Sequence, residues 1–300
     1  MRIGIDLGGT KIEGIILKSG GELQEKIRID TPGQDYDSVL QAVVDVINSL
    51  QEKAAQQLTV GIGTPGTLSM PSEVMKNCNS VCLNGRSLKK DLESALGYEV
   101  RLENDANCFT LSEAHYGAGA TAKSVFGVII GTGTGGGVVI DKKLLTGPNS
   151  IAGEWGHNSL PGSALALIDG QRSCYCGRSN CIETVLSGRG LSQTHFERTG
   201  EQLSAKEIAE AAGAGAPGVY ATLEIYCQQL AQCMATVVNI LDPEVIVLGG
   251  GLSNIALLYE KVPVFMADHV FTDNVLTRLA APRFGDASGA RGAACLWSSA

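Results

Sequence analysis

The sequence has few charged residues and no concentration of positive ones. Charged residues make up 18% of the chain, and 23 lysines and arginines stand against 31 acidic residues, for a net charge of −8. An average soluble protein has roughly a quarter of its residues charged. No cluster of lysine and arginine interrupts this acidic background. We therefore expect neither nucleic acid nor an anionic membrane surface as a partner.

Long apolar runs are missing as well. No stretch reaches the roughly 18 apolar residues that suit a membrane-spanning helix. The N-terminal segment places Asp6 and two glycines where a secretion signal needs apolar residues. The sequence therefore predicts a cytoplasmic protein that does not cross a membrane. In a reducing compartment its nine cysteines are not expected to form a disulfide framework.

Glycine, in contrast, is abundant. It accounts for 38 of the 300 residues, well above the roughly 7% of average proteins. The chain has no Gly-X-Y period and 44% of its residues are hydrophobic, which excludes collagen and disorder. Excess glycine in a globular chain indicates tight turns, or backbone that a ligand approaches closely.

Strands and helices alternate along the chain, which predicts an α/β fold with a mostly parallel sheet. A strand, a glycine turn and a second strand are expected over residues 2–17, and the same plan recurs over 125–140. The other expected elements are helices over 36–54, 105–116 and 223–241, and strands over 58–62, up to Leu102 and over 245–248. Ligands of such sheets bind at the carboxyl ends of the strands, where these glycine turns fall.

Three glycine-rich turns are candidates for phosphate binding, because successive backbone N–H groups in such turns hold anions without a basic field. Three ordinary hairpin turns are the alternative, which we consider weaker because all three follow strands. Two segments match G-x-G-x-x-G, but strand or loop residues follow them rather than a helix, so a dinucleotide site is not favoured. The candidate nucleotide-binding residues are Asp6, Gly8, Gly9, Thr10, Lys11, Gly131, Thr132, Gly133, Thr134, Gly135, Gly249, Gly250 and Gly251.

Asp105 lies where a predicted strand ends and a predicted helix begins. It is either the N-cap of that helix or a general base that takes the proton from an attacking hydroxyl during phosphoryl transfer. The sequence leaves both interpretations open.

Three cysteines fall within eight residues, at Cys174, Cys176 and Cys181, and His157 lies seventeen residues before the first of them. Three cysteines and one histidine form a common closed tetrahedral set, which predicts a structural zinc ion. The alternative is three core cysteines and an unrelated surface histidine.

The same segments make the chain resemble the ROK family (repressor, open reading frame, kinase) of sugar kinases over nearly its whole length. The similarity is carried by Asp6-x-Gly-Gly-Thr-Lys11, Asn104-Asp105, Gly131-Thr-Gly-x-Gly-Gly-Gly137, Glu154-x-x-His157, Cys174-x-Cys-Gly-x-x-x-Cys181-x-Glu183, Gly249-Gly-Gly251 and the tail from Gly285 to Ala293. Asn180 departs from the pattern, since the family usually has glycine there.

This resemblance implies a duplicated, actin-like (ribonuclease H-like) α/β fold with two domains flanking a catalytic cleft. It implies a smaller domain of residues 1–118 with a C-terminal helix at 288–300, and a larger domain of residues 119–287. It also implies ATP and Mg²⁺ bound by the glycine turns, a structural Zn²⁺ on His157 and the three cysteines, and a homodimer.

For the substrate, the resemblance implies a hexose that receives the γ-phosphoryl group on its 6-hydroxyl, with Asp105 as the catalytic base. The implied sugar ligands are Asn79, Asn104, Asp105, Glu154, His157 and Glu183. The segments 74–85, 156–161 and 285–289 look most like bacterial fructokinases, so fructose is the expected sugar. N-acetylglucosamine is the alternative, because its kinases share most of the chain. A sugar-responsive repressor of the same family is a remote alternative, since only five residues precede Asp6.

Overall fold

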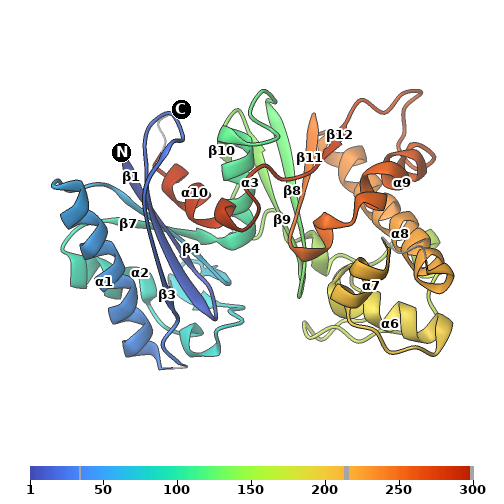
Figure 1. Cartoon of the computed structure of the whole chain (residues 1–300), viewed down its shortest axis with the longest axis horizontal. Coiled ribbons are helices and arrows are strands. Elements are labelled where there is room, and N and C mark those ends of the chain that lie inside the picture. The colour runs from blue at the N-terminus through green and yellow to red at the C-terminus, as the bar shows by residue number, and fades with distance from the viewer. Residues whose placement is uncertain (34, 213–215, 298–300) are drawn as a thin grey trace. The chain divides into compact units, whose positions relative to one another are not determined.

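A computed structural model describes residues 1–33, 35–212 and 216–297 (Figure 1). The chain divides into two compact units. Unit 1 consists of Met1–Thr121, Gly137–Ala152 and Phe284–Ala300, and unit 2 of Ala122–Gly136 and Gly153–Arg283. Unit 1 thus includes Gly137–Ala152, which the expected division at residue 118 assigned to the larger domain. As a boundary between folding domains, residue 118 stays a prediction.

Unit 1 is built on a mixed five-stranded sheet in the order β3-β2-β1-β4-β7. Its strands are β1 (Arg2–Leu7), β2 (Lys11–Leu17), β3 (Leu23–Asp30), β4 (Val60–Thr64) and β7 (Val100–Asn104). The pairs β1–β2 and β2–β3 are antiparallel, whereas β1, β4 and β7 are parallel. The expectation of a mostly parallel sheet is wrong here, because a short glycine turn can join only antiparallel strands.

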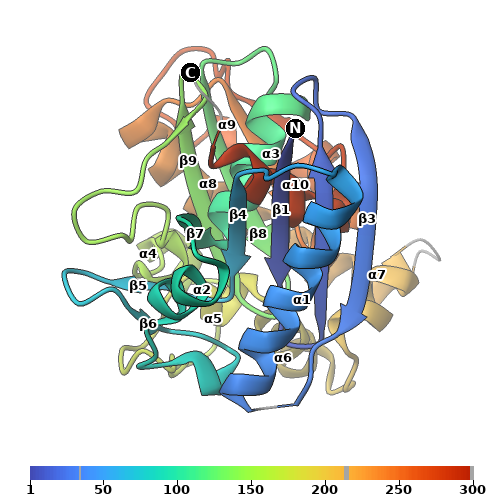
Figure 2. The same ribbon diagram turned by 90° about the vertical axis from the view of Figure 1, so that its left-hand side faces the viewer.

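Helices cover both faces of this sheet. Figures 1 and 2 show α1 (Tyr36–Ala54) and α2 (Leu88–Leu96) on one face, and α3 (Asp105–Tyr116) and α10 (Ser288–Cys295) on the other. The helices expected over 36–54 and 105–116 have those bounds. The C-terminal helix begins at the expected Ser288, but residues 298–300 of its expected range lie outside the described residues. A two-stranded ribbon, β5 (Thr67–Ser69) and β6 (Val74–Lys76), also belongs to this unit.

Three glycines allow α10 to lie directly on the sheet and on α3. A Cβ on Gly4 or Gly61 would fall 1.9 Å from a backbone oxygen of α10, and one on Gly292 would fall 1.6 Å from the Cys108 oxygen. Backbone cannot yield to such contacts. Part of the glycine excess therefore serves helix packing and not turns or ligands.

The second sheet has the order β10-β9-β8-β11-β12. Its strands are β8 (Ser124–Ile130), β9 (Thr134–Ile140), β10 (Lys143–Leu144), β11 (Val245–Gly249) and β12 (Arg278–Ala280). β11 is parallel to β8 and β12, and β10 is antiparallel to β9. The helices of unit 2 are α4 (Gly162–Leu165), α5 (Glu183–Leu186), α6 (Gly188–Thr199), α7 (Ala205–Ala212), α8 (Pro217–Leu241) and α9 (Ala256–Ala267).

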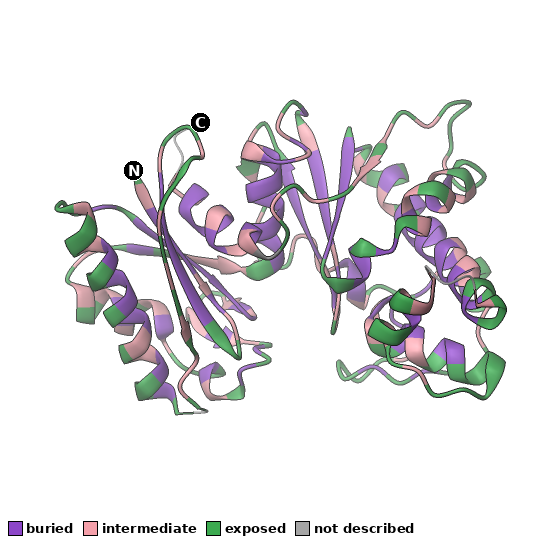
Figure 3. Ribbon diagram, viewed as in Figure 1, coloured by how far each residue is buried: buried purple, intermediate pink, exposed green. Residues whose placement is uncertain are grey.

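Both sheets share one strand plan, in which the first strand along the chain lies between its hairpin partner and the parallel strand that follows. This confirms the expected duplicated, actin-like (ribonuclease H-like) fold. Buried residues line the central strands of each sheet (Figure 3). Within the described part of the chain, none of the helices combines the length and apolar character that crossing a membrane requires.

Candidate functional site

The glycine turn of unit 1 joins β1 to β2 and leaves polar groups exposed. Gly8 N–H donates to the Lys11 carbonyl at 2.9 Å, and the Thr31 hydroxyl donates to the Gly8 carbonyl at 2.8 Å. Gly9, Thr10 and Lys11 are exposed. The Asp6 carboxylate lies against the first turn of α10, where a Cβ on Gly289 would fall 2.4 Å from its Oδ2. A carboxylate, a hydroxyl and an ammonium therefore belong to one turn.

Asn104, and not Asp105, is the N-cap of α3. Its side-chain oxygen accepts hydrogen bonds from Ala106 N–H (2.8 Å) and Asn107 N–H (3.3 Å). Asp105 is the first helical residue, is exposed, and accepts from Ala106 N–H at 2.7 Å. The N-cap interpretation of Asp105 is therefore wrong. Since Asn104 uses its oxygen on the helix, its amide N–H₂ is the group it can offer to a sugar hydroxyl.

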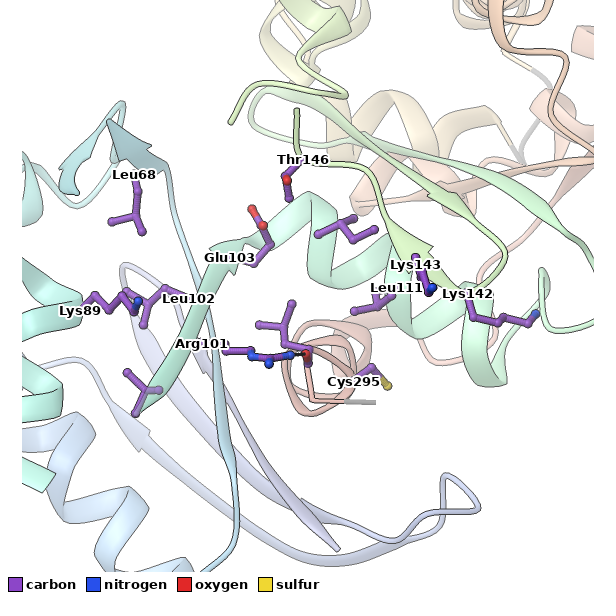
Figure 4. A pocket seen from close by; sticks show the side chains of 13 residues that line it. Leu68, Lys89, Arg101, Leu102, Glu103, Leu111, Lys142, Lys143, Thr146 and Cys295 are labelled. Atoms are coloured by element: carbon purple, nitrogen blue, oxygen red, sulfur yellow. Dashed lines mark hydrogen bonds between the residues drawn. The ribbon is translucent and has the colours of Figure 1, made fainter. Parts of the chain in front are cut away.

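Glu103 stabilises this strand end. Its Oε1 accepts from Asn104 N–H (2.9 Å) and from Asn107 Nδ2 (3.0 Å), while burial raises its pKa. Figure 4 shows Glu103 at a cavity of about 380 Å³ within unit 1, together with Arg101 and Lys142. Arg101 donates to the Leu296 carbonyl at 2.6 Å, and the Lys142 ammonium donates to backbone carbonyls. The sequence did not predict this cavity.

Asn79 is exposed in a loop of unit 1 that Asn84 closes. The Asn84 side chain accepts from Cys78 N–H at 2.9 Å and donates to the Cys78 carbonyl at 3.1 Å. Burial, with smaller contributions from Cys82 and the Asp105 carboxylate, raises the pKa of Cys78 to about 12. The charge of Asp105 therefore acts on the loop that carries Asn79.

In unit 2, the turn between β8 and β9 is held by hydrogen bonds to the segment 183–190. Thr134 N–H donates to Glu183 Oε2 at 2.9 Å, and Gly188 N–H donates to the Gly131 carbonyl at 2.7 Å. Thr134 is 5% exposed, and its hydroxyl has no hydrogen-bond partner among the residues that the structure describes. Leaving a buried hydroxyl unsatisfied is costly, so this group fits a ligand oxygen.

A cavity of about 980 Å³ opens beside this turn, entirely within unit 2. It brings together the predicted residues Gly131, Thr132 and Gly251, which come from the turns after β8 and β11. Ligand pockets typically measure about 300–1,000 Å³. The sequence analysis did not predict that α6 and α7 line this cavity. The motif Ser187-Gly-Arg-Gly190 could have indicated the contribution of α6. The additional lining residues include Gly188, Arg189, Ser192, Ser204, Lys206 and Asn254.

His157, Cys174, Cys176 and Cys181 converge, and their ligand atoms all lie within 4.8 Å of one another. Cys174 Sγ is 3.6 Å from His157 Nδ1, and Cys176 Sγ is 3.6 Å from Cys181 Sγ. Tetrahedral zinc with Zn–S bonds of about 2.3 Å separates its ligand atoms by roughly 3.8 Å, so this set fits the ion. Hydrogen bonds from Arg178 lower the pKa of Cys176 to about 6, whereas burial raises the pKa of Cys174 and of Cys181, so Cys176 is the cysteine that most readily forms a thiolate without a metal. Cys176 is exposed, so the alternative of three core cysteines does not apply to it.

Asn180 replaces the usual glycine of this loop without strain. Its φ is +55°, in the left-handed region that asparagine tolerates better than most residues. Its side-chain oxygen accepts from Arg172 N–H, and its own N–H donates to the Arg172 carbonyl, both at 2.8 Å. The departure from the family pattern therefore closes the loop that carries Cys174 and Cys176.

The predicted sugar ligands of unit 2 gather around Tyr175. Its hydroxyl lies 2.8 Å from His157 Nε2. Desolvation, followed by the negative charges of Glu183 and Glu154, raises the pKa of Tyr175 to about 12. Of the six predicted sugar ligands, Asn79, Asn104 and Asp105 belong to unit 1, and Glu154, His157 and Glu183 belong to unit 2. Their binding roles stay predictions.

We expect Gly133→Ala to displace Glu183 from the glycine turn. The new Cβ would fall 2.6 Å from Glu183 Oε2, the mobile end of a flexible side chain. Stability should therefore change by less than about 1 kcal/mol, whereas kcat/KM should fall about 100-fold because turn and carboxylate shift together. Thermal unfolding and steady-state kinetics measure both. Gly162→Ala, where nothing lies within 4 Å, is the control, and equal kinetics for the two variants would contradict this coupling.

Comparison with known proteins places the whole chain among ROK proteins. A model described as the ROK family matches residues 2–300. N-acetyl-D-glucosamine kinase of Pasteurella multocida is 38% identical, with 100% of both chains covered. The enzyme of the same name from Photobacterium profundum is 39% identical, with 99% of each chain covered. The solved structure of a ROK hexokinase from Thermus thermophilus has a TM-score of 0.86 at 29% identity, covering 98% of this chain and 96% of that chain.

The expectation of a fructokinase is wrong, because these full-length curated relatives are N-acetyl-D-glucosamine kinases. Two residues that carry the resemblance to fructokinases hydrogen-bond within the fold. Asn84 hydrogen-bonds the Cys78 backbone, and Ser288 donates to the buried Glu113 carboxylate. Such residues do not discriminate between sugars, since their polar groups are used within the fold.

Proposed function

Because this chain belongs to the ROK family, we propose that it is an ATP-dependent kinase that transfers the γ-phosphoryl group of ATP to the 6-hydroxyl of N-acetyl-D-glucosamine. The observation that carries the proposal is the full-length similarity to kinases named for that sugar, at 36–39% identity. Unit 2 contains a glycine turn beside a cavity, which could hold a nucleotide, and unit 1 contains an exposed carboxylate, which could serve as a general base; a kinase needs both.

The nucleotide would occupy the cavity of unit 2. The cavity is large enough for a nucleoside and is lined by Gly131 and Thr132. In our proposal, backbone N–H groups of the 131–135 turn and the hydroxyls of Thr132 and Thr134 would bind phosphate oxygens. Binding by backbone N–H groups explains how an acidic protein holds a polyphosphate. In unit 1, Asp6, Thr10 and Lys11 would serve the Mg²⁺ and the transferred phosphate. The bound Mg²⁺ would neutralise charge that develops on the phosphate oxygens.

The sugar hydroxyl would lose its proton to Asp105. This carboxylate is exposed and lies at the carboxyl end of β7, and α3 does not depend on it for capping. General-base transfer of this kind contributes about 10²–10⁴-fold to the rate. Asn79, Asn104, Glu154 and Glu183 would position the sugar through its hydroxyl and acetamido groups. For His157 to join them, its Nε2 would have to exchange the Tyr175 hydroxyl for a sugar hydroxyl.

Zinc on His157 and the three cysteines would be structural, because four protein ligands leave no open coordination position. The zinc ion would hold the loop from Arg172 to Cys181 in place. It would thereby orient Glu183, which lies two residues beyond the last ligand. A cytoplasmic location and a homodimer stay predictions from the sequence.

The substrate is tested with a coupled ADP-release assay over N-acetylglucosamine, glucose, mannose and fructose. We expect kcat/KM for N-acetylglucosamine to exceed that of each other sugar by about tenfold or more, because a site that hydrogen-bonds the acetamido group leaves polar groups unpaired without it. Phosphorus NMR of the product should place the phosphate on the 6-oxygen. A higher kcat/KM for any sugar without the acetamido group would refute the proposal.

A further inference from the structure

Arg172 is a buried cation that neither the glycine turns nor the cysteine cluster accounts for. Arg172 is 3% exposed. One guanidinium nitrogen, Nη1, donates to the carbonyls of Thr184 (3.1 Å) and Gly190 (3.3 Å). The other, Nη2, donates to the Thr194 hydroxyl (2.9 Å) and to Glu197 Oε2 (2.6 Å). The Arg172 guanidinium thus binds both ends of the segment 184–190 and the first turns of α6.

On its other side, this segment supports the predicted phosphate turn. Glu183, directly before the segment, accepts a hydrogen bond from Thr134 N–H, and Gly188 N–H donates to the Gly131 carbonyl near the segment's end. Gly188 and Arg189 also line the cavity of unit 2. Tyr226 of α8 donates to the Leu186 carbonyl at 2.7 Å and anchors the middle of the segment. Arg172 binds the two ends of the segment, at Thr184 and Gly190.

The backbone of Arg172 belongs to the cysteine loop. It exchanges two hydrogen bonds with Asn180, the residue before Cys181, and Cys174 N–H donates to the Arg178 carbonyl at 2.8 Å. One residue therefore joins the cysteine loop, through its backbone, to the support of the phosphate turn, through its side chain.

We propose that Arg172 is a positioning residue that couples metal binding at His157, Cys174, Cys176 and Cys181 to nucleotide affinity in the cavity of unit 2. The inference rests on the proposed function. A metal ion that orders the loop fixes the Arg172 backbone, and the guanidinium then holds the segment that supports the turn. By linkage, bound nucleotide must stabilise the metal by the same factor.

Arginine suits this role better than lysine. Its planar guanidinium presents five donors in a fixed fork, whereas the lysine ammonium is a flexible point charge with three. Arg172→Lys keeps the charge opposite Glu197 but cannot bind Thr184, Gly190 and Thr194 together. Removing the charge altogether would also leave Glu197 without its ion-pair partner, so lysine is the informative replacement.

The experiment measures the ADP dissociation constant by calorimetry for zinc-loaded protein and for protein stripped with a chelator. In the native chain, we expect stripping to weaken ADP by about fivefold or more, the usual lower range of allosteric coupling. In Arg172→Lys, with zinc content unchanged, the two dissociation constants should agree within twofold. Arg198→Lys, an exposed arginine of α6, should behave like the native chain.

Each outcome decides one question. Equal ADP affinity with and without zinc in the native chain would overturn the coupling, as would full coupling retained in Arg172→Lys or a native chain that binds no zinc. A native chain that binds zinc but no ADP would instead refute the proposed kinase. If Arg172→Lys does not fold, Glu197→Gln weakens the same fork from its other end and carries the same expectations.

Discussion

Asp105→Asn should lower kcat by about two to four orders of magnitude while leaving the fold and the sugar KM nearly unchanged. The amide has the shape of the carboxylate but cannot accept the proton from the sugar hydroxyl, and general-base catalysis is worth about 10²–10⁴-fold. α3 should persist because Asn104 provides its N-cap. Steady-state kinetics and thermal unfolding of the same preparation measure both effects.

The neighbouring residue is the matched control for stability. Asn104→Ala removes the capping oxygen from Ala106 N–H and Asn107 N–H, so its free energy of unfolding should fall by about 1 kcal/mol. Asp105→Asn should not show this loss. A kcat within tenfold of the native value would contradict the catalytic role of Asp105.

Cys176→Ala should abolish zinc binding and lower kcat/KM for the sugar about 100-fold. Because Cys176 is exposed, its truncation leaves no cavity, and the effect reports ligand loss rather than packing. Without its fourth ligand the loop no longer orients Glu183, and a misplacement of about 1 Å can cost 100-fold. Metal analysis, thermal unfolding and sugar kinetics measure the change, and the larger part should appear in KM.

The control for this variant is Cys82→Ala, which changes a partly exposed cysteine of unit 1 outside the cluster. Its zinc content and kinetics should match the native protein. A Cys176→Ala variant that retains one zinc per chain would show that the ligand set is misassigned.

Local patterns predicted most of the elements that position these groups. The helices at Tyr36–Ala54 and Asp105–Tyr116, the hairpins around both glycine turns and the convergence of three cysteines within eight residues all follow from residues near one another in the chain. One of the two interpretations left open for Asp105 placed the cap of α3 one residue too late, because asparagine and aspartate are equally good caps. Only the hydrogen bonds of the folded helix distinguish Asn104 from Asp105.

The sugar was the larger error, and its cause is physical. Residues such as Asn84 and Ser288 make a sequence look like one subfamily, yet their side chains bind backbone or buried carboxylate within the fold. Similarity over the whole chain averages over many such positions and favoured N-acetyl-D-glucosamine kinases instead.

By itself, the sequence determined the α/β class, the glycine turns, the cluster of cysteines and the acidic net charge, because each depends on composition or on neighbours along the chain. The tertiary structure alone decided that Gly4, Gly61 and Gly292 serve helix packing, that α6 and α7 line the cavity, and that Arg172 hydrogen-bonds both the cysteine loop and the segment behind the turn between β8 and β9. These relationships arise from contacts between residues far apart in sequence. A buried arginine and an exposed one have the same letter, and only folding distinguishes them.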